Sequence, residues 1–317
     1  MKSVVSQAPI NIALLKYWGK RDEQLVLPYT DSISLSLDLF QTTTTLSYQE
    51  IETPTFELNG CSDDQSAPKI FAFVKKMIGM EPKNLHISTR NSGPTAAGLA
   101  SSASGYAALS VAVNHYYNLQ LPEADLQTFT RMGSGSAIRS LKGGCVLWRR
   151  DGWIESVAFP FEDVVMAIFI VSHKQKQIGS TEAMRLSVQT SPLFPNWVEQ
   201  SISDNIEFLH ALQTKNFSLM GEISEQNALR MHRVCETTLP AIRYLTEQSY
   251  ELIHAIQKAR KQRISVYATA DAGPNVKAIL RKDDLPAFLE YMKQVTTITP
   301  LISGISLQGA RIIDETI

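Results

Sequence analysis

The fold is organised around one segment, which reads Asn91-Ser-Gly-Pro-Thr-Ala-Ala-Gly-Leu-Ala-Ser-Ser-Ala-Ser-Gly-Tyr-Ala-Ala-Leu-Ser-Val-Ala-Val-Asn-His-Tyr-Tyr-Asn118. Its first half consists of small and polar residues, and Pro94 and Gly98 bend the backbone there. Its second half has the apolar spacing of a helix, with one face formed by Leu99, Ala103, Tyr106, Val113 and Tyr117. Residues 85–89 are β-like. The order is therefore strand, loop and helix.

A loop of small residues that runs into a helix suits a phosphate group. The first backbone N–H groups of the helix point the same way, and the helix dipole adds partial positive charge. Ser101, Ser102 and Ser104 supply hydroxyl groups at this point. The alternative is a buried Ala-rich helix with a serine cap. The loop matches neither the Gly-x-Gly-x-x-Gly pattern nor the Gly-Lys-Ser/Thr P-loop, so the segment alone leaves both interpretations open.

Composition predicts a soluble globular protein of two domains. The chain has 317 residues, of which 44% are hydrophobic and 19% charged. Its formal net charge is -1, from 30 basic and 31 acidic residues. This balance gives no general attraction to nucleic acid or to an anionic membrane, so we expect neither as a partner. Any anion site must be local.

The sequence favours a cytoplasmic location. The N-terminus lacks the apolar core of a signal peptide, and no apolar run is long enough to span a bilayer. Cys61, Cys145 and Cys235 are odd in number and far apart, which favours a reducing compartment. The histidines form no paired metal spacing, and His232 is expected to be structural. No metal ligands can be assigned.

Basic and aromatic residues crowd the end of the first predicted strand. Ile10, Ile12 and Leu14 alternate with smaller or polar residues, as in a strand. The residues that follow at its end include Lys16, Tyr17, Trp18 and Lys20. Two ammonium groups and a phenol can donate hydrogen bonds to an anion. A solvated basic strand end is the alternative.

The rest of the chain shows strands first and mostly helices later. Residues 32–39 alternate strictly, and we expect residues 42–48 to be a partner strand. Asn59-Gly60 is a turn signal. Helices are predicted over residues 69–80, 123–131, 199–213, 217–233, 248–261 and 286–292, and further strands over residues 145–149, 164–171 and 263–270. The polar stretch 173–180 follows a buried strand, so we predict an N-terminal domain of residues 1–175 and a C-terminal domain of residues 176–317.

Two further segments have residues suited to chemistry. Residues 133–144 are rich in glycine and serine and contain Arg139, whose planar guanidinium suits a carboxylate or a phosphate. A flexible connection would have the same composition. Asp271 stands at the end of a predicted strand, within Asp271-Ala-Gly-Pro-Asn-Val276. It is either a turn former or a positioned carboxylate.

Together these segments resemble the diphosphomevalonate decarboxylase family of the GHMP kinase superfamily, over essentially the whole chain. The motifs are Asn11-Ile-Ala-Leu-Leu-Lys-Tyr-Trp-Gly-Lys-Arg-Asp22, Pro94-Thr-Ala-Ala-Gly-Leu-Ala-Ser-Ser-Ala-Ser104, Gly133-Ser-Gly-Ser-Ala-Ile-Arg-Ser140, Gly179-Ser-Thr-Glu-Ala-Met-Arg185 and the Asp271 turn. The resemblance implies a two-domain α+β fold of the GHMP kinase type. It also implies an active-site cleft between the domains, and a homodimer.

The reaction that the resemblance implies is ATP-dependent and uses Mg²⁺. The tertiary hydroxyl of mevalonate 5-diphosphate is phosphorylated, and phosphate and carbon dioxide then leave to give isopentenyl diphosphate, in the mevalonate pathway. One alternative is a phosphomevalonate decarboxylase, or a kinase that stops at the phosphorylated alcohol. A non-catalytic binding protein of the same fold is another, and it would lack the aspartate or the phosphate loop, both of which are present.

The resemblance also implies roles for individual residues. Asp271 would orient or deprotonate the hydroxyl, and Arg139 would face the substrate carboxylate. Tyr17 and Lys20 would contact the diphosphate. The implied substrate-binding residues are Asn11, Lys16, Tyr17, Trp18, Lys20, Ser134, Gly135 and Ser191. The implied nucleotide-binding residues are Thr89, Pro94, Ala97, Gly98, Leu99, Ala100, Ser101, Ser102 and Ser104.

The chain departs from the family pattern at two places. After Pro28, Thr30-Asp31-Ser32 stands where the family usually has Asn-Ser-Ser, and Asp31 adds a carboxylate where the substrate would be anionic. Ser92-Gly93 replaces an aromatic-containing pair before Pro94. Neither departure touches the residues to which the resemblance assigns chemistry.

Overall fold

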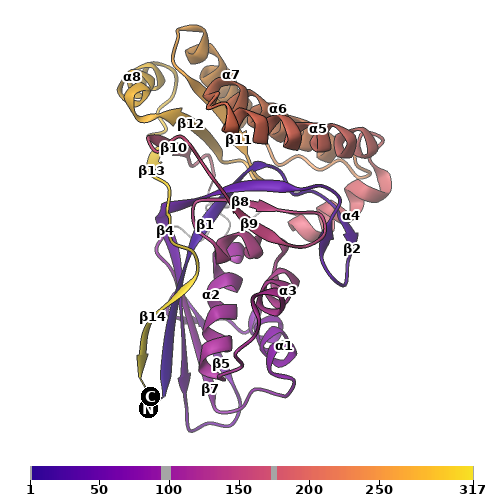
Figure 1. The fold of residues 1–317 in the computed structure, drawn as a ribbon, viewed down its shortest axis with the longest axis vertical. Coiled ribbons are helices and arrows are strands. Elements are labelled where there is room, and N and C mark those ends of the chain that lie inside the picture. The colour runs from indigo at the N-terminus through magenta and orange to yellow at the C-terminus, as the bar shows by residue number, and fades with distance from the viewer. Residues whose placement is uncertain (1, 94–100, 173–176, 317) are drawn as a thin grey trace.

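The computed structural model, which describes residues 2–93, 101–172 and 177–316, has two main β-sheets with helices packed on each (Figure 1). The N-terminal sheet is covered by α2 (Ser101–Tyr116), with α1 (Ala67–Ile78) and α3 (Glu123–Gly133) beside it. The second sheet is covered by α6 (Phe217–Glu236) and α7 (Glu247–Lys261). The α+β fold expected from the sequence is confirmed. A two-stranded hairpin of β2 (Lys20–Asp22) and β3 (Leu27–Pro28) projects beside α4 (Ser180–Thr190).

Within the described residues, the N-terminal sheet has eight strands in the order β14-β1-β4-β7-β5-β6, with β8 pairing β4 and β9 pairing β8. Its pairs are antiparallel except β5 with β7. The strands are β1 (Ser3–Leu15), β4 (Ser32–Tyr48), β5 (Thr55–Leu58), β6 (Cys61–Ser62), β7 (Leu85–Asn91), β8 (Cys145–Trp148), β9 (Ile154–Val157) and β14 (Arg311–Thr316). Asn59 and Gly60 have φ of 54° and 82° between β5 and β6, as the turn signal predicted.

The expectation that residues 42–48 form a separate partner strand is wrong. Residues 32–48 are one strand, β4, which pairs with β8 through its first residues and with β7 through its last. Its alternation breaks because the register with β1 shifts between Pro9 and Asn11. A bulge of this kind bends a strand without ending it, and in the sequence it looks like a turn.

The helix of the organising segment, α2 (Ser101–Tyr116), lies across β1 and β4. Ala107, Ala108 and Ala112 are fully buried, so the helix backbone approaches the sheet closely. The hydroxyl of Ser6 on β1 donates to the Ala108 carbonyl oxygen at 2.7 Å. Of the predicted face, Ala103 and Val113 are buried, and Leu99 lies outside the described residues. The alanines therefore serve close packing on both sides of the helix.

Two more helices of the N-terminal part flank α2. They are α1 (Ala67–Ile78) and α3 (Glu123–Gly133). A 3-10 helix follows at once over Gly135–Leu141, and its Ala137, Ile138, Arg139 and Ser140 are buried. Residues 135–141 are thus regular, buried structure, and the alternative of a flexible connection is wrong.

The second sheet has four strands in the order β11-β12-β10-β13, all antiparallel. Its strands are β10 (Val164–Phe169), β11 (Val266–Ala270), β12 (Val276–Arg281) and β13 (Leu301–Ser303). The helices of this half are α4 (Ser180–Thr190), α5 (Phe194–Gln213), α6 (Phe217–Glu236), α7 (Glu247–Lys261) and α8 (Leu285–Val295). Helix α6 contacts both β11 and β1, so it joins the two sheets.

The end of the chain returns to the N-terminal sheet. After β13, the backbone of Ser306 pairs with Ser36 and Gly144, and β14 then runs antiparallel to β1. The indigo start and the yellow end of the chain therefore lie side by side in Figure 1. The domain boundary at residue 175 stays a prediction. Among the described residues, no helix has the length and apolar character needed to cross a membrane.

Candidate active site

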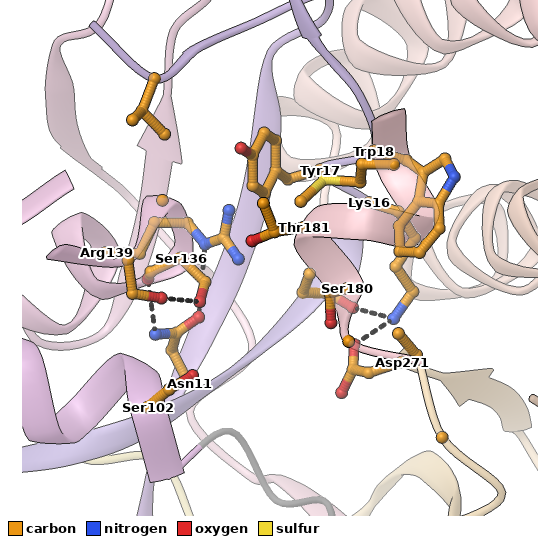
Figure 2. A pocket seen from close by; sticks show the side chains of 18 of the residues that line it. Asn11, Lys16, Tyr17, Trp18, Ser102, Ser136, Arg139, Ser180, Thr181 and Asp271 are labelled. Atoms are coloured by element: carbon orange, nitrogen blue, oxygen red, sulfur yellow. Dashed lines mark hydrogen bonds and ion pairs between the residues drawn. The ribbon is translucent and has the colours of Figure 1, made fainter. Parts of the chain in front are cut away.

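A cavity of about 820 Å³ lies between the two halves. It is lined by the end of β1, the residues around the 3-10 helix, the start of α2, the start of α4 and the turn after β11. Figure 2 shows side chains from these distant segments pointing into one space. The sequence-predicted residues Asn11, Lys16, Tyr17, Trp18, Lys20, Ser102, Ser134, Gly135, Arg139 and Asp271 all line it.

The end of β1 is shaped to present side chains to this cavity. Gly19 has φ of +91°, and an added Cβ would lie 2.7 Å from the Phe194 ring, so the sharp turn there requires glycine. Just before it, the Trp18 indole donates to Ser187 Oγ at 3.0 Å, which ties the strand end to α4. The backbone N–H of Lys16 donates to Asn227 Oδ1 on α6 at 2.8 Å. The predicted basic cluster is therefore held by two helices of the second half.

Asp271 is bound by two ammonium groups. Lys16 Nζ lies 2.8 Å from Oδ1, and Lys277 Nζ lies 3.0 Å from Oδ2. Both lysine side chains are 2% exposed, whereas Asp271 is 28% exposed and lines the cavity. Asp271 directly follows β11, as predicted, and the two lysines hold its carboxylate in place within the turn.

The charges in this cluster shift one another's protonation. Burial alone would raise the pKa of Asp271, but Lys16 and Lys277 outweigh burial and hold that pKa well below its usual range. Burial lowers the pKa of Lys16 to about 8, against the attraction of Asp271 and helped by Lys277 and Arg139. Asp271 is therefore ionised at neutral pH, and Lys16 can lose its proton in mildly alkaline solution.

Arg139 is fixed by neutral partners. Its Nε donates to Asn11 Oδ1 at 3.3 Å, and another nitrogen donates to Ser32 Oγ at 2.8 Å. The Asn11 amide in turn donates to Ser140 Oγ at 2.8 Å and to the Ser136 carbonyl at 3.2 Å. Figure 2 shows Asn11, Ser136 and Arg139 close together at the cavity. Burial lowers the pKa of Arg139 to about 10. An arginine that is 3% exposed and held by neutral groups keeps its charge available for an anion.

Tyr17 and Gly135 pack together at the wall of the cavity. A Cβ on Gly135 would lie 2.8 Å from the Tyr17 ring, so only glycine permits this contact. The Tyr17 ring also packs on Trp148, with centroids 4.6 Å apart. No described residue hydrogen-bonds to the buried Tyr17 hydroxyl. Burial raises the pKa of Tyr17, so the phenol stays a neutral donor. Such a donor suits an anionic ligand.

The nucleotide-binding residues expected from the sequence fall into three groups. Ser102 is exposed in the first turn of α2 and lines the cavity, and Ser101 begins that helix. Thr89 and Ser104 are not among the described lining residues, and their hydroxyls contact those of Thr44 and Thr42 on β4. The loop residues Pro94, Ala97, Gly98, Leu99 and Ala100 lie outside the described residues.

Ser191 also lies away from the described cavity lining. Its hydroxyl contacts the Thr237 hydroxyl at 2.7 Å, at the C-terminal end of α4. Asp31, the unexpected carboxylate, accepts a hydrogen bond from the Arg150 backbone N–H and does not line the cavity. The Asp31 carboxylate is therefore not among the described groups that line this space. Ser92 exchanges hydrogen bonds with Gln41 on β4 and so anchors the start of the loop.

Several residues of the site had no role in the sequence-based assignment. Lys69 and Arg131 line the cavity, and so do Ser180 and Thr181 at the start of α4. Ser32 accepts a hydrogen bond from Arg139, and Ser140 accepts one from Asn11. Lys277 forms an ion pair with Asp271. Ser180 and Thr181 belong to the quoted motif around residue 180, which was a usable signal. Lys277 also offers a signal in the sequence, because it lies between the apolar residues Val276 and Ala278 of β12.

The cavity is a local cationic site in a nearly neutral protein. Among its described lining residues, Lys16, Lys20, Lys69, Arg131 and Arg139 have cationic side chains and Asp271 has a carboxylate. In the described parts of the chain, no group of three or more His, Cys, Asp or Glu side chains is arranged to hold a metal ion. The arrangement suits a ligand with several negative charges. It also offers a carboxylate to accept a hydrogen bond.

This fold and this site define an enzyme of the GHMP kinase type, with its active site between two α+β units. A family model described as the diphosphomevalonate decarboxylase-like N-terminal domain matches residues 8–158. One described as the mevalonate 5-diphosphate decarboxylase C-terminal domain matches residues 166–308. The chain belongs to the diphosphomevalonate decarboxylase family.

Individual relatives are similar over almost the whole chain. The diphosphomevalonate decarboxylase of Danio rerio is 34% identical, over 92% of this chain and 80% of its own. The Homo sapiens protein is 33% identical, over 91% and 79%. A solved structure described as MDDEF in complex with MVAPP, AMPPCP and magnesium superimposes with a TM-score of 0.91 at 32% identity, covering 99% of both chains. Mevalonate diphosphate decarboxylase from Staphylococcus aureus gives the same TM-score at 35% identity, covering 99% of this chain and 98% of its own.

Proposed function

We propose that this protein catalyses the ATP-dependent decarboxylation of mevalonate 5-diphosphate to isopentenyl diphosphate, with release of ADP, phosphate and carbon dioxide, in the mevalonate pathway of isoprenoid biosynthesis. The observation that carries the proposal is the meeting of Asp271 and Arg139 in one cationic cavity. The names of the relatives and the ligands of the solved complex support the choice of substrate and nucleotide.

Asp271 acts on the tertiary hydroxyl. Its carboxylate is ionised and partly open to the cavity, so it accepts a hydrogen bond from the hydroxyl and directs the oxygen toward the terminal phosphorus of ATP. The hydroxyl oxygen forms the new P–O bond and the bond to ADP breaks. The hydroxyl proton passes to Asp271 or onward to solvent.

Arg139 acts on the substrate carboxylate. Its guanidinium is already held by Asn11 and Ser32, so it loses little conformational entropy when it binds two carboxylate oxygens. When the C–O bond to phosphate breaks, the electron pair of the C–C bond to the carboxylate moves to form the double bond. Carbon dioxide leaves from beside Arg139, and phosphate leaves near Lys16.

The remaining cavity residues bind the phosphate groups. Tyr17 and Lys20 donate to the diphosphate, with Ser134 and Gly135 beside them, while Trp18 and Asn11 position the strand end and Arg139. The start of α2 with Ser101 and Ser102 receives the ATP phosphates, together with residues 94–100 and Ser104. Thr89 and Ser191 would act from outside the described lining.

Mg²⁺ fits this donor set only as a partner of the nucleotide. The described lining offers Asp271, already bound to two lysines, and hydroxyls such as that of Ser102. Mg²⁺ bound mainly by phosphate oxygens needs few protein ligands, and Ser102 is the residue that would supply one. The ion neutralises phosphate charge when bound.

We further propose that the protein is cytoplasmic and a homodimer.

One assay tests the proposed function. The purified protein is given ATP and Mg²⁺ with either mevalonate 5-diphosphate or mevalonate 5-phosphate, and ADP, phosphate and carbon dioxide are quantified together. We expect equal amounts of all three from the diphosphate. Release of ADP without carbon dioxide would identify a kinase that stops early. Carbon dioxide mainly from the monophosphate would identify a phosphomevalonate decarboxylase.

A further inference from the structure

Lys277 is a buried cation behind the active-site cavity. It lies on β12, its side chain is 2% exposed, and its ammonium group is 3.0 Å from Asp271 Oδ2. It does not belong to the described lining of the cavity. A substrate in the cavity therefore meets Asp271 but not Lys277.

The fold by itself does not call for a lysine at this position. The neighbouring Val276, Ala278, Ile279 and Leu280 are fully buried, and β12 packs in an apolar core. Burying an ammonium group costs free energy that only a well-placed counter-ion offsets. An apolar side chain of similar length would pack there without that cost. The gain from Lys277 must therefore lie in what it does to Asp271.

The two lysines that bind Asp271 are not equivalent. Lys16 lines the cavity, and its ammonium group is shared between Asp271 and the Ala13 carbonyl oxygen at 2.7 Å. It can turn toward an incoming phosphate group. Lys277 approaches Asp271 from the opposite oxygen and from the protein side. It stays with the carboxylate when a substrate arrives.

Charged and titratable groups face Asp271 from four elements. They are Lys16 at the end of β1, Lys277 on β12, Arg139 on the 3-10 helix and His232 on α6. Burial lowers the pKa of His232 to about 3, so this imidazole is neutral at working pH. Arg139 is engaged with Asn11 and Ser32. Lys277 is thus the cation in direct contact with Asp271 that a substrate does not reach.

We propose that Lys277 is a positioning residue for the decarboxylation, which keeps Asp271 ionised and fixed so that Lys16 is free to bind a phosphate group of the substrates. The inference rests on the proposed function. In this inference, Lys277 is the permanent counter-ion of Asp271, and Lys16 contacts the substrate. Without Lys277, Asp271 would keep its charge only while Lys16 remained bound to it.

The test compares Lys277→Met, Lys277→Arg and Lys16→Met with the wild-type enzyme. For each, kcat is measured against pH, and the ¹³C signal of the Asp271 carboxyl is followed during a pH titration. Loss of a contacting opposite charge raises a carboxyl pKa by about one unit or more. We therefore expect the acid limb of kcat in Lys277→Met to move up by about one pH unit or more, with KM for ATP changed less than about threefold. Lys277→Arg should restore the wild-type limb.

Lys16→Met keeps the inference testable even if Lys277→Met fails to fold. In Lys16→Met, Lys277 remains in place, so the ¹³C titration should show Asp271 ionised down to its ordinary pKa of about 3.9 or below. A rise of the Asp271 pKa well above this value in Lys16→Met would overturn the proposal. An unchanged acid limb in folded Lys277→Met would overturn it too.

A remote ion pair supplies the structural control. Arg260 lies 2.9 Å from the buried Glu225, and neither residue lines the described cavity. Arg260→Met should lower the melting temperature and leave the pH profile of kcat unchanged. If the wild-type enzyme released no carbon dioxide, the proposed function itself would fail. If the wild-type enzyme turns over, and the pH profile of kcat in Lys277→Met matches that in Arg260→Met, only the role of Lys277 is rejected.

Discussion

Lys16 and Asp271 stand 255 positions apart in the chain, and the Lys16 ammonium lies 2.8 Å from Asp271 Oδ1. The contact joins the end of β1 in the first sheet to the turn after β11 in the second. The charged centre of the cavity exists only when both halves are folded and docked.

Asp271→Asn should abolish nearly all turnover. The amide cannot accept the hydroxyl proton, and it leaves Lys16 and Lys277 without a carboxylate between them. We expect kcat to fall by about 100-fold or more, with the affinities for both substrates changed far less. Steady-state kinetics and circular dichroism check this. Asp163→Asn, at a half-exposed pair with Arg281, is the control. Retention of more than about a tenth of kcat would refute the role of Asp271.

Lys20→Ala should weaken mevalonate diphosphate much more than ATP. Lys20 lines the cavity and is 10% exposed, beside Glu23 at 3.2 Å. Loss of one charge-assisted contact costs about 1.5–3 kcal/mol, or about tenfold or more in affinity. Binding of each substrate is measured by calorimetry. Lys83→Ala, at an exposed pair with Glu52, should change neither affinity. An equal loss of affinity for mevalonate diphosphate and for ATP would contradict this assignment and place Lys20 near the nucleotide.

The alkaline limb of kcat/KM should report Lys16. Burial lowers its pKa to about 8, so the ammonium charge is present below that pH and is lost as the pH rises through it. Since kcat/KM reflects the free enzyme, we expect it to fall above about pH 8. Arginine keeps its proton over this range, so Lys16→Arg should move the limb upward. A limb at the same pH in Lys16→Arg would assign it to another group.

Arg139→Ala should impair decarboxylation more than phosphoryl transfer. In the proposed mechanism, the guanidinium faces the substrate carboxylate, whereas the transferred phosphate meets Asp271 and Lys16. We expect a lower kcat/KM and a ratio of carbon dioxide to ADP below that of the wild type. Rapid-quench measurement of both products decides this. Arg139→Lys keeps the positive charge but cannot donate two parallel hydrogen bonds to a carboxylate. It should therefore restore substrate binding more fully than the ratio of carbon dioxide to ADP. Equal losses of ADP and carbon dioxide would place Arg139 in both steps.

His232 should make the protein less stable in acid. Burial lowers the pKa of His232 from 6.5 to about 3, so the folded state resists protonation that the unfolded state accepts. Stability from this group is complete above pH 6.5 and is lost as the pH falls toward 3, by up to about 1.4 kcal/mol per pH unit. Urea unfolding of His232→Asn between pH 7 and pH 4 should show a flatter pH dependence. An unchanged slope would contradict this.

The parts of the site that could be predicted lie in continuous motifs. The order of Lys16, Tyr17, Trp18 and Lys20 at a strand end was readable because strand alternation stops just before it. The turn at Asp271 was readable for the same reason. In both cases local backbone signals place the side chain, and the fold supplies only the partner.

What could not be predicted depends on tertiary contacts. Ser32 holds Arg139 across 107 positions, and a serine in an alternating strand gives no sign of such a partner. A register shift and a turn break alternation alike, so the sequence pattern does not show that β4 is continuous. The sequence pattern does not indicate helix α4, because its amphipathic pattern is short and follows a polar stretch. Helix α5 begins at Phe194, earlier than its spacing indicated, because Pro195 suits a first helical turn.

The pairing of β14 with β1 has a consequence for synthesis on the ribosome. Ser3 at the start of β1 pairs with Thr316, and the other edge of β1 pairs with β4. A nascent chain can form the β1–β4 core early, but one edge of β1 stays open until residues 311–316 leave the exit tunnel. Open strand edges invite pairing with other chains. Translation that stalls before β14 should therefore leave an aggregation-prone product.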